Sequence, residues 1–466
     1  MRILIQNIHI FSTDGEESVL NFSESLTFVY GNVGAGKSTM LNLIMYGLGG
    51  SLTCTPAVRN CLKAVQLEVM LGDRPFRFFR MANSNRIQVD DISGKQRVNL
   101  LQKDVSAFLY RQFSLPDVYL SMGNIEDKKV TLSFNNFCWF SYLKQSEMDN
   151  SFFFLDSDNI YKQNAAINVL FSFFESEFLI DPKASQRYRD LKGRIRRYEE
   201  GQKVFEYLEP VFCGGVPDAG APEAYAAQLK RRIADALSGS SSHTTASLAS
   251  LLSMQKQLDQ LTYKMSFDRK RKRYHQELAS LQKEMDGITS AVRFEQSMEN
   301  PYVQQLYDLF GDCLANIGFH GVSKFDTIRM DPKTYMPVLC NPYENREVSF
   351  ETLGSGGKKT LFKICFALAV HRLQHAKPEL NYLPSFLIID TPMKNISERE
   401  DSVMYDKFYQ YLFRLFSTEL ADTQLFVVDK EKRELSDYRF RENIVLMRMT
   451  RDEGMNPPLF KNYKGL

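Results

Sequence analysis

The spacing of apolar residues changes from a strand pattern to a helix pattern near the start of the chain. Ile3–Ile5 and Leu26–Tyr30 are short apolar runs rich in β-branched and aromatic residues, and such runs predict strands. A glycine-rich loop follows the second run, and apolar residues then recur at helical spacing from Leu41 to Leu48. The pattern therefore predicts strand, loop and helix in that order.

The next part of the chain mixes the same two patterns. Val65–Leu71 and Phe76–Met81 predict strands, and Lys103–Phe113 predicts a helix. Globular sequence returns at Pro301, where the apolar runs Phe386–Ile389 and Leu425–Val428 are typical of strands buried on both faces. The predicted class is α/β, with one lobe over residues 1–181 and a second over residues 301–466.

Residues 182–300 between the lobes are charged and helix-favouring. Gln186–Glu200 and Ser253–Met285 predict two long helices. Two stretches dense in helix breakers, Cys213–Pro222 and Ser238–His243, are alternative tips where a hairpin reverses. Arms of roughly 30 to 50 residues would reach about 45 to 75 Å, which is a short antiparallel coiled-coil hairpin.

Net charge, hydropathy and cysteine usage say little about which ligand or partner the protein binds. A net charge of +2 over 466 residues gives no global field for nucleic acid, so any DNA-binding surface must be local. One candidate is Arg269–Arg273, with Lys264 nearby, for which a solvated helix face is the favoured alternative. No run approaches the roughly 18 apolar residues of a membrane span. The scattered cysteines form no CxxC pair, so a reducing cytoplasmic compartment is expected: Cys54, Cys61, Cys138, Cys213, Cys313, Cys340 and Cys365.

Gly31–Ser38 matches the P-loop pattern GxxxxGK[ST] and lies between a predicted strand and a predicted helix. Such a loop turns backbone N–H groups toward phosphates, while Lys37 meets the β and γ phosphates and Ser38 ligates magnesium. The predicted ligands are ATP and Mg²⁺. The residues expected to contact them here are Gly31, Asn32, Gly34, Ala35, Gly36, Lys37, Ser38 and Thr39.

Asp390 closes the apolar run Phe386–Asp390, which is how a Walker B aspartate is presented to a metal. A third segment, Leu353–Leu361, is glycine-rich and opens a predicted helix. It resembles the signature motif of ABC ATPases, in which Ser355, Gly356 and Gly357 would bind the γ-phosphate of ATP held by the opposite subunit.

The order P-loop, helical insertion, signature and Walker B resembles the heads of Rad50, RecN and SMC proteins. In such heads Gln145 would be the Q-loop glutamine that touches magnesium and the attacking water. The resemblance implies an ABC-type P-loop ATPase head, made of N- and C-terminal lobes, that forms a homodimer around ATP. The chain has no CxxC, so the zinc hook of Rad50 is not carried over from this resemblance.

Several positions depart from this family pattern. Thr391 follows Asp390 where the family has a glutamate, and a threonine cannot accept the proton of the attacking water, so slow hydrolysis is expected. Glu398 and Glu400 are possible substitutes. The usual switch histidine is replaced by Asp429 and Lys430; Lys430 either reaches a γ-phosphate or is a surface lysine. Asn395–Glu398 lacks the expected D-loop aspartate.

Three functions remain open. The favoured one resembles the ABC ATPases of antiphage systems such as PARIS, Lamassu or Septu, in which the ATPase responds to a phage-encoded trigger and restrains a nuclease or toxin effector. A Rad50-like or SMC-like ATPase of DNA repair or maintenance is the second. The third is a scaffold that binds ATP without cleaving it, as Thr391 would permit.

Overall fold

The structure is a computed structural model of the chain. It describes all residues except 95, 116–118, 121–129, 175–181, 214–221, 239–247, 296–300, 320–325, 332–334, 342, 344–345, 378–381, 393–401, 436–437, 451–458 and 461–466. Contacts divide the chain into two compact units. Met1–Ile180 and Gln296–Leu466 form the first, here called the head, and Asp181–Glu295 form the second, the helical insert.

One sheet of the head is a six-stranded antiparallel meander with the order β2-β1-β4-β5-β6-β7. Buried and more exposed residues alternate along most of its strands, as expected of a sheet with one face on the core. In the first strand the buried residues are Ile3, Ile5, Ile8 and Ile10. A β-bulge between Ile5 and Asn7 accounts for the shift in that alternation. The strands are β1 (Ile3–Ser12), β2 (Glu17–Asn21), β4 (Leu62–Leu71), β5 (Arg74–Met81), β6 (Arg86–Asp91) and β7 (Gln96–Leu101).

The second large sheet is parallel throughout and takes strands from both ends of the chain. Its order is β10-β14-β15-β3-β16. The strands are β3 (Leu26–Gly31), β10 (Tyr142–Leu143), β14 (Phe386–Asp390), β15 (Gln424–Asp429) and β16 (Val445–Met449). The N-terminal β3 lies between two C-terminal strands, so the two sequence lobes share one sheet and one core. The carboxyl ends of these strands meet at one edge, where ligands of open α/β sheets bind.

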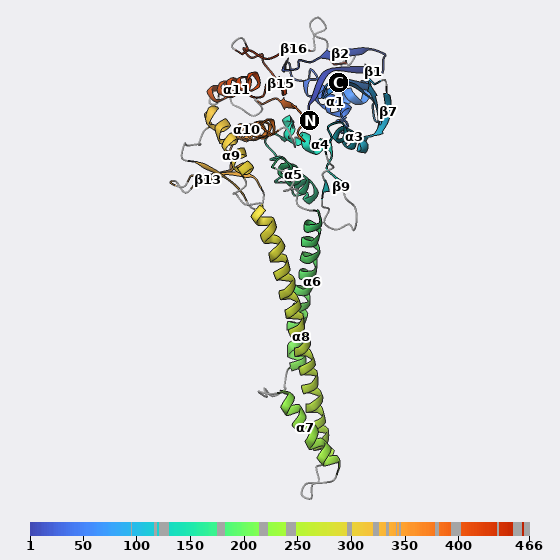
Figure 1. The fold of residues 1–466 in the computed structure, drawn as a ribbon, viewed down its shortest axis with the longest axis vertical. Coiled ribbons are helices and arrows are strands. Elements are labelled where there is room, and N and C mark those ends of the chain that lie inside the picture. The colour runs from blue at the N-terminus through green and yellow to red at the C-terminus, as the bar shows by residue number, and fades with distance from the viewer. Residues whose placement is uncertain are drawn as a thin grey trace. The chain divides into compact units, whose positions relative to one another are not determined.

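Helices cover these sheets, as Figure 1 shows. Those of the head are α1 (Lys37–Gly47), α2 (Pro56–Cys61), α3 (Val105–Gln112), α4 (Phe134–Phe137), α5 (Ile160–Ser172), α9 (Pro301–Asn316), α10 (Gly356–His375) and α11 (Ser402–Ser417). The described residues of the head also form two small sheets: β8 (Tyr119–Leu120) with β9 (Val130–Thr131), and β11 (Thr327–Met330), β12 (Pro337–Asn341) and β13 (Arg346–Ser349). Every residue of α10 from Thr360 to His371 is buried, so this helix runs through the interior of the head.

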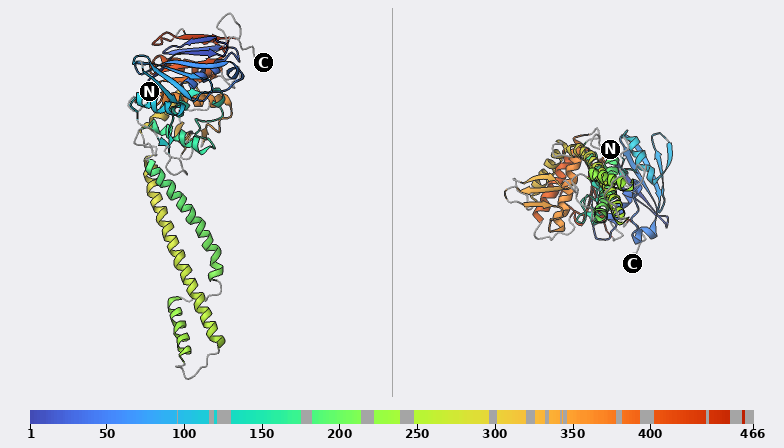
Figure 2. Two further views of the ribbon diagram at one scale, coloured as in Figure 1. Left: turned by 90° about the vertical axis from the view of Figure 1, so that its right-hand side faces the viewer. Right: turned by 90° about the horizontal axis from the view of Figure 1, so that it is seen from below.

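The described residues of the helical insert form three helices: α6 (Pro182–Cys213), α7 (Pro222–Leu237) and α8 (Leu248–Glu295). Both α6 and α7 pack along α8, which Figures 1 and 2 also show. The chain therefore reverses between α7 and α8, at the second of the two predicted tips. The other predicted tip falls between α6 and α7, where it interrupts the first arm of the hairpin. Residues 214–221 and 239–247 of these stretches lie outside the described residues. Two arms were predicted, whereas the part of the insert that the structure describes has three helices.

Small apolar clusters and ion pairs hold the insert together. Leu191 and Ile195 pack on Leu278 and Leu281, and a second cluster joins α7 to α8. The basic run on α8 contributes to this pairing, since Arg269 and Arg271 form ion pairs with Glu223 and Glu209, and Arg273 with Glu277 one turn away. Exposed pairs of this kind contribute little stability each, but they pair the arginines of the run with carboxylates of the insert itself. They favour the solvated-face interpretation of the run.

The α/β head with an inserted helical unit is confirmed, whereas coiled-coil packing of the insert stays a prediction. The strands and helices expected near the P-loop are found as β3 and α1, and those expected downstream as β4, β5 and α3, the last preceded by a 3₁₀ turn, Gln102–Asp104. Within the described part of the chain, no helix is long and apolar enough to cross a membrane.

Candidate nucleotide site

The P-loop connects β3 to α1 at the carboxyl edge of the parallel sheet. Gly31 and Gly36 have φ values of 133° and 95°, in the region that favours glycine. A Cβ at Gly31 would lie 2.0 Å from the carbonyl oxygen of Met449 on the neighbouring β16. The Gly31 N–H donates to the carbonyl of Lys430 at 3.2 Å, which ties the loop to the end of β15. The loop shape therefore depends on glycine at both positions.

Lys37 extends back across this loop. Its Nζ donates to the carbonyl oxygens of Gly31 at 2.6 Å and Asn32 at 2.8 Å. Burial lowers the pKa of Lys37, and the nearby carboxylates of Asp390 and Asp429 oppose that shift. A cation is thus held against two backbone carbonyl oxygens of the loop that precedes a helix N-terminus, an arrangement that suits phosphate groups.

Ser38 and Asp390 meet beside Lys37. The Ser38 hydroxyl donates to Oδ1 of Asp390 at 3.1 Å, although the residues belong to opposite ends of the chain. Asp390 is only 3% exposed, and burial raises the pKa of its carboxyl group, while hydrogen bonds from Ser38 and Thr391 act in the opposite direction. A hydroxyl and a carboxylate are hard oxygen ligands, so the pair fits Mg²⁺, which also takes phosphate oxygens and water.

Gln145 approaches the same carboxylate, but through its backbone. β10 pairs with β14, which places the following 3₁₀ turn, Gln145–Glu147, beside the end of β14. The backbone N–H of Gln145 is one of the hydrogen bonds that lower the pKa of Asp390. The side chain of Gln145 is half-buried. Its predicted contact with magnesium stays a prediction.

Thr391 has an unusual backbone conformation for a β-branched residue. Its φ is 60°, which costs energy for such a side chain and is typical of functional or strained sites. Its N–H donates to the carbonyl of Val428 at 2.9 Å, and its hydroxyl donates to Oδ1 of Asp390 at 3.0 Å. The side chain thus faces the candidate metal site without supplying a base. Residues 393–401, which include Glu398, Glu400 and the D-loop segment, lie outside the described residues.

A second buried carboxylate stands on the next strand. Asp429 is 1% exposed, accepts from the Tyr409 hydroxyl, and accepts from the Lys430 N–H at 2.7 Å. Burial raises the pKa of Asp429. The side chain of Lys430 is exposed, and its charge contributes to lowering the pKa of Lys37. Tyr409 lies on α11, and no local pattern in the sequence indicates its contact with Asp429.

The signature segment lies apart from this cluster. Ser355 is the exposed N-cap of α10, where its hydroxyl accepts from the N–H of Lys358 at 3.3 Å, and Gly356 begins the helix. Among the residues that the structure describes, no hydrogen bond or ion pair joins residues 353–357 to the P-loop or to Asp390. One chain therefore brings together Lys37, Ser38, Gln145 and Asp390, but not Ser355.

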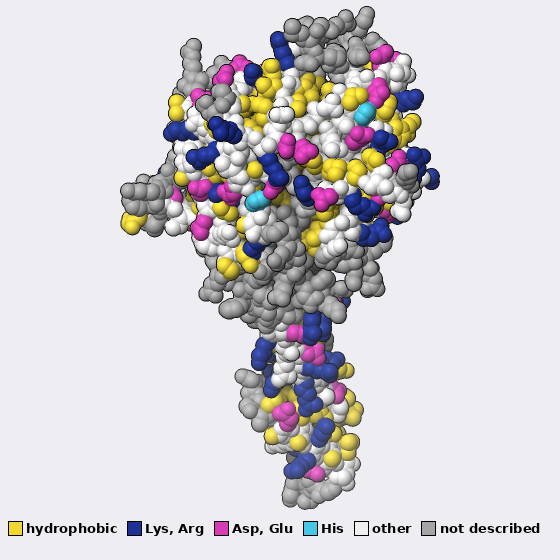
Figure 3. Space-filling model, turned by 45° about the horizontal axis from the view of Figure 1, so that its top comes forward, with side chains coloured by type: hydrophobic (Ala, Val, Ile, Leu, Met, Phe, Trp, Pro, Cys, Tyr) yellow, Lys and Arg dark blue, Asp and Glu magenta, His cyan; other side chains and the backbone are white. Residues whose placement is uncertain are grey.

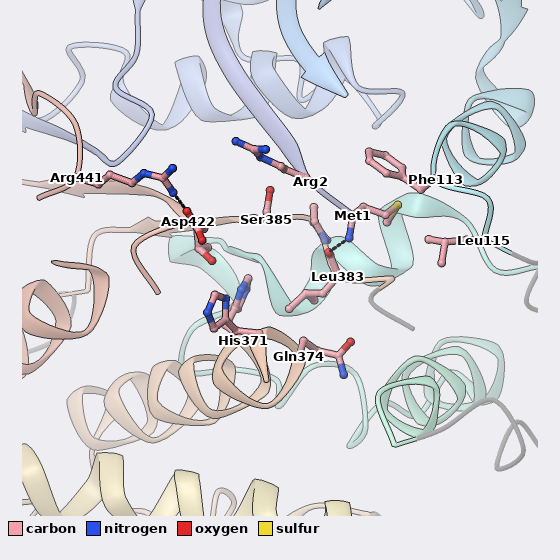
Figure 4. A pocket seen from close by; sticks show the side chains of 13 residues that line it. Met1, Arg2, Phe113, Leu115, His371, Gln374, Leu383, Ser385, Asp422 and Arg441 are labelled. Carbon is pink, nitrogen blue, oxygen red and sulfur yellow. Dashed lines mark hydrogen bonds and ion pairs between the residues drawn. The ribbon is translucent and has the colours of Figure 1, made fainter. Parts of the chain in front are cut away.

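A pocket of about 610 Å³ occupies the opposite edge of the parallel sheet. Ser385 and Thr423, which line it, directly precede β14 and β15, so the pocket opens at the amino ends of these strands. Figure 4 shows Asp422 paired with Arg441 there, and the Met1 amino group donating to the carbonyl of Leu383. It is separate from the P-loop.

On the side of the head visible in Figure 3, acidic and basic side chains are interspersed among the described residues without a large single-sign patch. In the described residues, no group of three or more His, Cys, Asp or Glu side chains is placed to hold a metal ion. A magnesium ion at Ser38 and Asp390 would therefore depend on phosphate and water for its other ligands.

A fold with a P-loop at the carboxyl edge of a parallel sheet defines a nucleotide-binding α/β protein. The family model described as "AAA domain" matches residues 2–292, and the chain belongs to this family. Membership implies nucleotide binding. A search of curated proteins finds no match.

The solved structures with some similarity include SMC heads. One is the Smc head domain with an extended coiled coil bound to the C-terminal domain of ScpA, from Pyrococcus furiosus (14% identity, 92% of this chain and 90% of that chain, TM-score 0.40). Another is the Smc head domain with a coiled coil and joint, from Pyrococcus yayanosii (15% identity, 92% of each chain, TM-score 0.37). A third is the SmcHead bound to the C-winged helix domain of ScpA (12% identity, 92% and 90%, TM-score 0.40).

Proposed function

We propose that the chain binds ATP with Mg²⁺ at the P-loop and dimerises around two such nucleotides, with slow hydrolysis. The observation that carries the proposal is the meeting of Ser38 and Asp390 at 3.1 Å beside the loop that holds Lys37. The fold brings a lysine, a hydroxyl and a buried carboxylate to one helix N-terminus, although the carboxylate comes from a distant part of the chain. This combination suits a nucleotide with its metal ion.

Each residue has a distinct task in this proposal. The Lys37 ammonium exchanges its two carbonyl contacts for phosphate oxygens. Ser38 and Asp390 would hold magnesium, which when bound neutralises phosphate charge. The Gln145 backbone N–H keeps the Asp390 carboxylate oriented. Thr391 closes the site beside Asp390 and leaves the attacking water without a base.

Dimerisation is supported by the position of Ser355. Ser355 stands exposed at the N-cap of α10, followed by a half-buried Gly356 and a buried Gly357, and in the described residues no hydrogen bond joins it to the P-loop of the same chain. A helix N-terminus of this kind binds anions, so in a dimer Ser355, Gly356 and Gly357 would contact the γ-phosphate held by the partner.

The test uses the wild-type chain. Titration calorimetry with ATP and magnesium is expected to show binding, and light scattering is expected to show a dimer that forms with ATP and dissociates with ADP. Phosphate release then separates the alternatives. A slow but measurable rate supports a weak ATPase, whereas ATP-dependent dimers with no release support the scaffold. No ATP binding overturns the proposal.

Replacing Thr391 with glutamate is expected to raise the rate of phosphate release about tenfold or more, because a carboxylate can accept the proton of the attacking water. This expected gain is smaller than the usual general-base effect of about 10²- to 10⁴-fold, since the left-handed backbone at this position turns the side chain away from an ordinary strand direction. Single-turnover phosphate release measures it. Thr391→Gln has the same bulk without the base, so equal rates for the two variants would contradict this explanation.

The finer role proposed is that of a sensor or scaffold in an antiphage defence complex that controls a nuclease or toxin effector. Its support is the short insert, in which α8 has 48 residues and thus spans about 70 Å, together with Thr391. Cells carrying the chain with its neighbouring genes are expected to plate phage at lower efficiency than cells carrying Lys37→Ala. Equal plating, with a repair nuclease encoded next to the chain, would favour the DNA-maintenance alternative.

A further inference from the structure

Lys363 is a buried lysine in the middle of α10. It is 4% exposed, and its Nζ donates to the carbonyl oxygens of Glu147 and Ser151, each at 2.7 Å. Burial lowers its pKa to about 8, so the side chain is still mostly cationic at neutral pH. Lysine is almost never this buried without partners, and in the described residues its direct partners are backbone carbonyls rather than a carboxylate.

The segment that Lys363 holds is tightly folded. Phe153 and Phe154 have φ values of 54° and 65°, which bulky residues rarely adopt. Asp156 supports this turn by accepting from the Ser151 hydroxyl and the Phe152 N–H, each at 3.0 Å. The Lys363 Nζ also lies 4.9 Å from the centre of the Phe153 ring. Two successive left-handed aromatic residues persist only where surrounding contacts impose them.

The same segment begins at the candidate metal site. The 3₁₀ turn Gln145–Glu147 has its first N–H on the Asp390 carboxylate and the carbonyl of its last residue on Lys363. Lys363 lies on α10, eight positions after the N-cap Ser355, or about 12 Å along the helix axis. A continuous set of contacts therefore leads from Asp390 through the turn and Lys363 to the exposed N-terminus of α10.

An apolar residue would fit the surroundings at least as well, because Phe152, Phe153 and Phe366 crowd this part of the core. It would leave the two carbonyls of residues 147 and 151 without their donor. Burying a cation costs free energy, because the charge loses its hydration. Here the two hydrogen bonds of Lys363 fix the distance between α10 and the turn.

We propose that Lys363 is a positioning residue that couples the turn at Gln145–Glu147 to the signature segment at the start of α10. A nucleotide bound beside Asp390 moves or stiffens the turn. Lys363 passes this change to the N-terminus of α10, where Ser355 is then positioned to contact the partner. The inference rests on the proposed function, and it adds a route of regulation within one head.

The experiment compares Lys363→Met with Lys162→Met. Lys162 lies over the Phe154 ring at 5.0 Å but is exposed and bonds no carbonyl of the turn, so it is a matched control. Lys363→Met is expected to bind ATP within about threefold of wild type, yet to need about fivefold or more ATP for half-maximal dimerisation. Lys162→Met is expected to match wild type in both. A Lys363→Met chain that dimerises like wild type overturns the inference.

A second measurement keeps the test decisive if Lys363→Met folds poorly. Hydrogen exchange on Ser355→Arg, which is expected to stay monomeric, follows the amides at the start of α10 before and after ATP is added. Slower exchange there on ATP binding supports coupling within one head, and unchanged exchange despite bound ATP overturns it. Absence of ATP binding in wild type would instead overturn the proposed function.

Discussion

Replacing Lys37 with alanine is expected to weaken ATP binding by at least about 100-fold, as measured by titration calorimetry with magnesium. The ammonium is the cation at the centre of the loop, and hydrogen bonds from a charged donor contribute about 1.5–3 kcal/mol each. Its present contacts, to the carbonyls of Gly31 and Asn32, show that it is already aimed along the loop. Loss of two phosphate contacts accounts for a change of this size.

The variant should remain folded. Burial lowers the pKa of Lys37, so the ammonium is held at some cost in the free protein, and its removal is expected to leave the melting temperature unchanged or higher. Lys103→Ala, on the exposed 3₁₀ turn before α3, is the control and should bind ATP as wild type does. Lys37→Ala that binds within threefold of wild type would show that the P-loop is not the nucleotide site.

Replacing Ser355 with arginine is expected to abolish ATP-dependent dimers while ATP binding stays within about threefold of wild type. The residue is exposed at the N-terminus of α10, away from the P-loop of its own chain, so a bulky side chain there obstructs only a partner. Loss of the N-cap costs about 1 kcal/mol, which a head of this size tolerates. Light scattering with and without ATP measures the outcome.

Ser355→Ala separates bulk from chemistry. It removes the cap and the hydroxyl but adds no obstruction, so dimerisation should be weakened rather than lost. If Ser355→Arg forms dimers as wild type does, α10 does not face a second nucleotide, and the sandwich arrangement is wrong whatever the P-loop binds.

Much of the site could be predicted because its motifs are local. The run Leu26–Tyr30 and the spacing of Gly31–Ser38 require a strand, a tight loop and a helix whatever surrounds them, and the structure has β3, the loop and α1 there. Asp390 was also predictable, because a carboxylate that closes a run of apolar residues must emerge at the end of a buried strand. These features depend on neighbours in sequence.

The hairpin of the insert was predicted less well. Helix-favouring composition correctly located α6 and α8. The sequence could not tell which of the two helix-breaking stretches reverses the chain, because only the packing of α6 and α7 on α8 decides this. The composition of a loop indicates where a helix ends. Tertiary packing decides which helix the next helix packs against.

By itself, the sequence determined the α/β class, the P-loop pattern with Lys37 and Ser38, and the threonine that follows Asp390. The tertiary structure alone decided that β3 lies between β15 and β16, that Thr391 is left-handed, and that Lys363 reaches the carbonyl groups of a turn more than 200 residues away. The reason is physical: periodicity and motif spacing record what a residue needs from its near neighbours, whereas strand order, strain and the partners of a buried charge are set when distant segments compete for one core.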